Sequence, residues 1–269
     1  MTRAVRRDAI SYAARRPYEN VFLQWVLEGG QGPGAPDQLM LSRDARGRVN
    51  GLAYFGAQLS IASDDGRALD AIAIETRKHS GLRSFVGPKD TVDGLWSRVE
   101  RWHAQPIIVR DTQPLYAVAS AELRPAGTDP GVRRACLDDT ELVADNSARM
   151  ILGELGYDPR TNRAGFIAAV RRAIAQGLWW VWIVDGVLRF QLNVGPRSAA
   201  TAQLQGVWTP PEQRGRGYAK LGLGAIARQL LTSEATLSLY VNDFNAPAIA
   251  LYERLGFHRA GTFATYLFP

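Results

Sequence analysis

A basic, glycine-rich segment near residue 215 has the composition of an anion-binding loop. An apolar run at residues 204–209 has the pattern of a strand, and Pro210 and Pro211 end its ability to donate ladder hydrogen bonds. A helical pattern then extends over residues 218–231. Because a helix N-terminus presents free backbone N–H groups and the positive end of the helix dipole, this junction is suited to a phosphate. The segment reads Arg214-Gly215-Arg216-Gly217-Tyr218-Ala219. Its glycines allow the backbone to approach a ligand closely, and its arginines add positive charge that can pair with a phosphate.

A second motif follows, in which a strand leads into a short helix. Asn245 is expected to cap this helix, with Pro247 in its first turn and Gly256 at its end. Since seven residues make about two helical turns, Asn245 and Tyr252 are expected on one face. The two parts of the motif are Leu239-Tyr240-Val241-Asn242-Asp243-Phe244-Asn245 and Leu251-Tyr252-Glu253-Arg254-Leu255-Gly256-Phe257.

Together, these two motifs resemble the GNAT superfamily of N-acetyltransferases, whose acyl-CoA pyrophosphate loop reads (Gln/Arg)-x-x-Gly-x-(Gly/Ala). The ending at residues 261–268 also resembles the last strand of a bacterial branch that carries a degenerate acetyltransferase-like half in front. The resemblance covers about half of the chain strongly and the rest loosely. It implies an α/β (α+β) fold with two tandem GNAT-like domains. Each domain would be a mixed, mostly antiparallel sheet flanked by helices.

By this resemblance the cofactor is acetyl-CoA, and the reaction is direct transfer of an acetyl group to a primary amine in a ternary complex. The pyrophosphate would lie on the loop at residues 214–219, and the pantetheine arm along the end of the preceding strand. The cofactor-binding residues implied in this way are Val207, Trp208, Thr209, Arg214, Gly215, Arg216, Gly217, Tyr218, Ala219, Asn242 and Asn245.

Two residues are candidates for the proton transfers of this reaction. Tyr252 is the candidate general acid: its proton transfer to a thiolate is uphill by roughly 2 kcal/mol at ordinary pKa values. Glu154, which follows an apolar run, is the first candidate for the general base. For each residue an ordinary structural role stays open, and water could serve as base for an α-amine. Gln203 and Gln205 alternate onto one face of the central strand and could contact the acceptor.

The segment at residues 124–131 is the best linker, because it has two prolines, two glycines and no apolar periodicity. It divides the chain into a degenerate acetyltransferase-like domain at residues 1–123 and a catalytic domain at residues 132–269. In the first domain, residues 106–118 are expected to form strands broken at Asp111-Thr112-Gln113-Pro114. The turn Gly87-Pro88-Lys89-Asp90-Thr91 also leads from a strand to a helix, but it lacks the Arg-Gly-x-Gly core of the cofactor loop, and Pro88 removes an N–H.

The second domain is expected to follow the order helix, helix, hairpin, strand, loop, helix, strand, helix, strand. Asp185-Gly186 is a strong signal for a two-residue hairpin turn. Next to it, Trp180 and Trp182 should share one face of a strand and Trp179 the other, with core packing as the simplest role.

The overall composition excludes several classes of protein. Among 269 residues there is no apolar run of about 18, so no membrane span is expected. A single cysteine, Cys136, fits a reducing cytosol and a cytoplasmic location. Three scattered histidines have no ligand spacing, so no metal is expected. The net charge of +6 suggests nucleic-acid binding as a function, but the sequence has no motif of aromatic and basic residues that would recognise a nucleic acid.

Several alternatives stay open at this level. The acyl group could differ from acetyl, because the loop binds CoA rather than its cargo. A binding module that senses acyl-CoA without turnover is the alternative from another class. The acceptor could be a small amine, an amino acid, an antibiotic or a protein amine, and the oligomeric state cannot be inferred.

Overall fold

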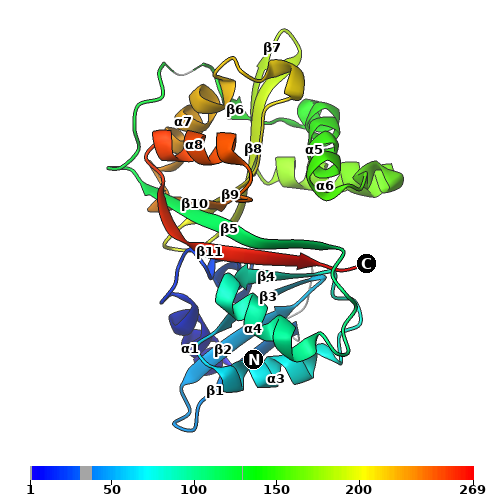
Figure 1. Cartoon of the computed structure of the whole chain (residues 1–269). Helices are drawn as coiled ribbons and strands as arrows, with labels where there is room; N and C mark the ends of the chain where they lie inside the picture. Colours follow the sequence, from blue (N-terminus) through cyan, green and yellow to red (C-terminus); the bar gives the residue numbers. More distant parts are fainter. Residues whose placement is uncertain (1, 31–37, 129) are drawn as a thin grey trace.

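In the computed structural model, which describes residues 2–30, 38–128 and 130–269, the strands form one mixed, mostly antiparallel sheet (Figure 1). Only two neighbouring pairs are parallel, β3 with β4 and β9 with β10. Across the sheet the order is β1 (Leu39–Arg43), β2 (Val49–Phe55), β3 (Gln58–Ser63), β4 (Ser84–Pro88), β11 (His258–Leu267), β5 (Ile108–Ala119), β10 (Thr236–Tyr240), β9 (Ala202–Trp208), β8 (Val187–Arg197), β7 (Trp179–Val184) and β6 (Arg133–Arg134).

The two halves of the chain repeat one order of elements. In the first half, β3, α3 (Gly66–Thr76), β4, α4 (Lys89–Val99) and β5 follow one another. In the second half the same order is β9, α7 (Tyr218–Leu230), β10, α8 (Ala246–Arg254) and β11. Two helices precede each series, α1 (Arg3–Ala13) and α2 (Val21–Leu27) in the first, α5 (Thr140–Leu155) and α6 (Arg163–Ala175) in the second. The expected tandem α/β fold is therefore confirmed.

The last strands of the two halves are exchanged at the centre of the sheet. β5 pairs with β10 of the second half, and β11 pairs with β4 of the first. β5 and β11 also pair with each other, and Figure 1 shows them side by side between the two halves. Each half thus supplies a strand that extends the sheet of the other. The predicted domains, residues 1–123 and 132–269, share one continuous sheet. The division of the chain into these two domains stays a prediction.

The predicted break within residues 106–118 is wrong, because β5 is continuous from Ile108 to Ala119. Its register against β11 shifts where Thr265 pairs with Arg110 and Phe263 pairs with Gln113. Two residues of β5 therefore face one residue of β11, which is a β-bulge. Pairing with β11 on one side, and hydrogen bonds from the backbone N–H groups of Val241 and Asp243 on the other, hold this polar segment extended.

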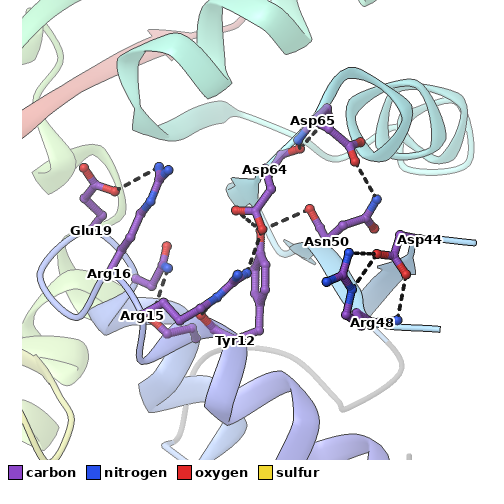
Figure 2. Close-up of polar contacts among 12 residues, drawn as sticks. Tyr12, Arg15, Arg16, Glu19, Asp44, Arg48, Asn50, Asp64 and Asp65 are labelled. Carbon is purple, nitrogen blue, oxygen red and sulfur yellow. Dashed lines mark hydrogen bonds and ion pairs between the residues drawn. The ribbon is translucent and has the colours of Figure 1, made fainter. Parts of the chain in front are cut away.

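The comparison of residues 87–91 with the cofactor loop was also wrong. Those residues lead from β4 into α4, whereas the position between β3 and α3 corresponds to the cofactor loop. There the Asp65 carboxylate accepts a hydrogen bond from the backbone N–H of Ala68 at 2.9 Å and so caps α3 (Figure 2). Asp64 pairs with Arg15 at 2.7 Å. Two carboxylates thus occupy the place where an anion would bind, as expected for a degenerate half.

The helices cover both faces of the sheet, and the buried residues on the two faces form separate hydrophobic clusters. Trp180 and Trp182 belong to one buried cluster with residues of α7 and α8, and Trp179 belongs to another with residues of α5 and α6, as predicted. The hairpin turn between β7 and β8 is confirmed, since Asp185 and Gly186 have φ values of 51° and 73°.

Gly256 gives the first prediction, because it holds α8 against the chain that links the two halves. Its φ is +94°, and a Cβ placed there would collide with the carbonyl oxygen of Glu122. Gly256→Ala should therefore lower the free energy of unfolding by at least about 3 kcal/mol. Gly47 is the matched control: its φ is +75° and a Cβ added to it would meet nothing within 4 Å, so Gly47→Ala should cost only about 1 kcal/mol. Equal shifts in urea unfolding of the two variants would contradict the collision.

Candidate functional site

The start of α7 presents a row of backbone amides without protein acceptors. Among the described residues, none of the backbone N–H groups from Gly215 to Lys220 donates a hydrogen bond, and the first to do so is that of Leu221, to the Gly217 oxygen at 3.1 Å. Gly215 and Gly217 have left-handed φ values of 75° and 79°, and Gly217 caps the helix without a side chain. Such a concave run of N–H groups binds anions.

The two arginines of the loop are placed differently. The Arg214 guanidinium lies 4.8 Å from the centroid of the Trp208 ring, and its Nε donates to the Thr209 oxygen at 3.1 Å. Arg214 therefore folds back and fixes the end of β9. Arg216 is exposed and forms no ion pair with any described residue. Its charge is available to an anion on the loop.

Next to this loop, β9 and β10 separate. They pair only at Leu237 with Ala202 and at Ser238 with Gln203, whereas β9 continues to Trp208. Within the described part of the chain, Trp208 Nε1 and Thr209 Oγ1 are buried without a hydrogen-bond partner. Unpaired buried polar atoms are costly, so this end of β9 is suited to a polar ligand. Val207 lies beside them, half-buried.

Tyr252 and Glu154 come together in this region from α8 and α5. Tyr252 is 5% exposed and packs against Tyr116 and Phe257. Burial raises the pKa of the Tyr252 phenol, and the Glu154 carboxylate adds to this. The same two causes raise the pKa of Tyr240 on β10. The charge of Glu154 therefore acts on both phenols.

Glu154 itself is at the exposed end of α5, yet the protein atoms around its carboxyl group raise its pKa by desolvation. Arg110 opposes this rise with its positive charge. The Arg110 guanidinium donates to the backbone oxygen of Glu154 at 2.9 Å and lies 4.8 Å from the Phe244 ring. Arg110 belongs to β5, so the first half of the chain supplies the cation next to this acid.

The two asparagines of the second motif have structural partners. Asn245 accepts a hydrogen bond from the N–H of Ala248 at 3.3 Å, so the predicted cap of α8 is confirmed. The Asn242 oxygen accepts from Gln113 of β5 at 2.9 Å, and Gln113 in turn accepts from Thr265 of β11 at 2.7 Å. Asn242 is therefore held by the exchanged strands. The cofactor roles of both asparagines stay predictions.

A cavity of about 550 Å³ lies between the two halves and is lined in the second half by residues of β8 and β9 and by the segment after α6. Gln203 and Gln205 both line it, as expected for alternating residues, and Gln205 donates to Gln203 at 3.1 Å. Tyr240 lines the same cavity, so the cavity reaches the gap between β9 and β10. Its far wall comes from α2, β3 and β4 of the first half.

Sequence reasoning did not single out Tyr240, Arg110 or Gln113. Tyr240 lies within the second motif, whereas the other two are on β5, whose partner strands have no local signal in the sequence. Within residues 2–30, 38–128 and 130–269, no cluster of three His, Cys, Asp or Glu residues could hold a metal ion. In the same part of the chain, no helix is both long and apolar enough to cross a membrane.

Known protein families and solved structures share features of this sequence and fold. Residues 197–267 match the model of the family described as FR47-like protein, and residues 39–143 match a domain of unknown function, DUF4081. A GNAT-family acetyltransferase from Colwellia psychrerythraea is 12% identical with a TM-score of 0.58, over 97% of this chain and 96% of the other.

A GCN5-related N-acetyltransferase from Kribbella flavida is 15% identical with a TM-score of 0.59, over 97% and 95% of the two chains. The chain has the fold of the GNAT acetyltransferases. A tandem GNAT protein from the clavulanic acid biosynthesis pathway is 14% identical, with a TM-score of 0.56 over 97% and 93%, and it shares the tandem GNAT arrangement. The sequence matches no curated protein. The GNAT fold supports acyl transfer from an acyl-CoA in general.

An ion pair between α5 and Glu212, just before the predicted cofactor loop, gives the second prediction. Arg149 donates to both carboxylate oxygens of Glu212, at 3.0 and 2.8 Å, and these bonds lower the pKa of Glu212 to about 2. Both side chains are exposed, so a double-mutant cycle with Arg149→Ala and Glu212→Ala should give a coupling below about 1 kcal/mol at pH 7. Because the folded pKa is depressed, this coupling is present above the unfolded pKa near 4.5 and is lost toward pH 2. A coupling as large at pH 2 as at pH 7 would contradict this assignment.

Proposed function

We propose that this protein is an N-acetyltransferase that uses acetyl-CoA and acetylates a primary amine by direct transfer in a ternary complex. The observation that carries the proposal is the row of amides from Gly215 to Lys220 without acceptors among the described residues. The unpartnered Trp208 Nε1 and Thr209 Oγ1 support it, because they lie on the backbone segment that the resemblance assigns to the pantetheine arm.

The cofactor fits the residues present. The amides at the start of α7 and the Arg216 guanidinium would hold the diphosphate, and the backbone from Val207 to Thr209 would hold the pantetheine arm. When bound there, acetyl-CoA supplies the acetyl group as a thioester. The gap between β9 and β10 then leads from this arm to the cavity between the two halves.

Tyr252 would supply a proton to the sulfur as the carbon–sulfur bond breaks and the carbon–nitrogen bond forms. Its raised pKa keeps the phenol protonated at neutral pH, but it also makes the proton more costly to give up. Proton donation is therefore coupled to bond breaking, when the sulfur carries developing charge in the same buried surroundings. The proton that the amine loses goes to a base or to water.

Glu154 is the base that the geometry favours. Desolvation raises the pKa of its carboxyl group, which makes the carboxylate a stronger base, and Arg110 favours the charged form. The second half of the chain is thus the catalytic domain in this proposal, and the first half contributes Arg110 and Gln113 through the exchanged strand β5. The acceptor is a small-molecule or protein amine.

The third prediction concerns cofactor affinity. Arg216→Ala should weaken coenzyme A binding about tenfold in calorimetry, because it removes a charge-assisted contact with the diphosphate. Arg228→Ala is the matched control, since Arg228 is exposed in the last turn of the same helix. This control should leave the affinity unchanged. Absence of coenzyme A binding by the unaltered protein would contradict the proposal.

The fourth prediction separates catalysis from binding. Tyr252→Phe should lower kcat at least about tenfold in a thiol-release assay with acetyl-CoA and a panel of amines, with unchanged affinity for acetyl-CoA. Removal of one hydroxyl leaves the packing against Tyr116 in place. An unchanged kcat would remove Tyr252 from the mechanism.

The same assay on the unaltered protein separates the alternative functions. Coenzyme A binding without thiol release would indicate an acyl-CoA sensor. Thiol release from another acyl-CoA alone would indicate a different acyl donor.

A further inference from the structure

Among the described residues that line the cavity between the two halves, one is acidic, and the first half of the chain supplies it. Glu19 follows α1 and lines the cavity, with 19% of its side chain exposed. Burial raises the pKa of the Glu19 carboxyl, and Arg16 opposes this rise. A carboxylate that is partly removed from water gains from a cationic partner.

The described residues of the cavity wall offer Glu19 no such partner. The basic residue that lines the cavity, Arg197, is 3.3 Å from Glu234. Arg16 approaches Glu19 only to 3.5 Å, from outside the lining, and its own side chain is 56% exposed (Figure 2). An ion pair of this kind contributes little. The protein therefore neutralises the Glu19 carboxylate only weakly, through the long contact with Arg16.

The sheet register locates this charge relative to the proposed reaction centre. A Cβ at Gly261 of β11 would lie 3.0 Å from a carboxylate oxygen of Glu19, so the carboxylate rests on the strand at a position where glycine leaves room. Gly261 pairs with Leu115 of β5, and Leu115 pairs with Tyr240 of β10. Two strand spacings separate Gly261 from Tyr240, which is about 10 Å.

The walls between these two points suit an apolar body. Phe263, two residues after Gly261 on β11, lines the cavity, with its ring centroid 5.0 Å from that of Tyr240. Phe22 and Trp25 of α2 line the same cavity from the first half. A volume of about 550 Å³ matches a small molecule rather than a folded partner.

We propose that Glu19 binds a second positively charged group of the acceptor, about 10 Å from the amine that is acetylated. The acceptor class is thus a small dication with an apolar segment between its charges. This inference rests on the proposed function, since the acetylated amine is placed at the gap beside Tyr240. At that distance Glu19 contacts the acceptor as a specificity-determining residue and does not reach the thioester.

The test compares 1,8-diaminooctane with octylamine, two amines of equal chain length that differ in the second charge. Calorimetry measures their binding to the full chain saturated with coenzyme A. The unaltered protein should bind the diamine at least about tenfold more tightly. In Glu19→Gln this preference should fall below about threefold, while octylamine affinity stays unchanged. Glu28→Gln is the control, because Glu28 is an exposed acid at the end of α2, and it should retain the preference.

Two results would overturn the inference: equal binding of the two amines by the unaltered protein, or an intact diamine preference in Glu19→Gln. Gly261→Ala provides a second variant, because its methyl group would displace the Glu19 carboxylate, and it should lower the preference as well. Coenzyme A binding is measured first in every sample. Its absence from the unaltered protein contradicts the proposed function, whereas normal coenzyme A binding without a diamine preference contradicts only the role of Glu19.

Discussion

The first backbone N–H groups of a helix have no partner within the helix, and the two halves of this protein meet that constraint in opposite ways. At the start of α3, Asp65 accepts from the backbone N–H of Ala68, and a second carboxylate, Asp64, lies beside it. At the corresponding start of α7, Gly217 occupies the cap and has no side chain to offer an acceptor. One helix start is therefore closed to anions, and the other is open to them. The proposed cofactor site depends on this difference.

The exchange of β5 and β11 connects the open helix start to the rest of the molecule. Because β5 lies beside β10, residues of the first half reach the second motif: Gln113 holds Asn242, and Arg110 holds the end of α5 next to Glu154. Because β11 lies beside β4, the two halves also enclose the cavity on which Glu19 and Tyr240 converge. The degenerate half thus has structural contacts with the candidate site even though its own anion position is occupied by carboxylates.

Features with local signals were predictable from the sequence. Residues 218–231 were expected to be helical and α7 spans Tyr218–Leu230, Asn245 caps α8, and Asp185 and Gly186 form the turn. The alternation of Trp179, Trp180 and Trp182 between two cores follows from strand geometry alone.

The errors come from contacts between distant segments. The polar residues at 111–114 resemble a turn, but pairing with β11 and hydrogen bonds from Val241 and Asp243, which follow β10, keep them in a strand with a bulge. The turn that corresponds to the cofactor loop was misassigned, because only the sheet order shows which strand is the counterpart of β9. Glu19 and Arg110 had no signal, since their proximity to the second half depends on the strand exchange.

Binding of the diphosphate by the start of α7 is tested most directly by the response of individual backbone amides to coenzyme A in ¹H–¹⁵N correlation spectra. Pantetheine is the comparison ligand, because it keeps the thiol arm and lacks the diphosphate. We expect the amides of Gly215 to Lys220 to shift with coenzyme A and far less with pantetheine, while the capped amide of Ala68 shifts with neither. Coenzyme A binding that leaves the amides from Gly215 to Lys220 unshifted would contradict diphosphate binding at this helix start.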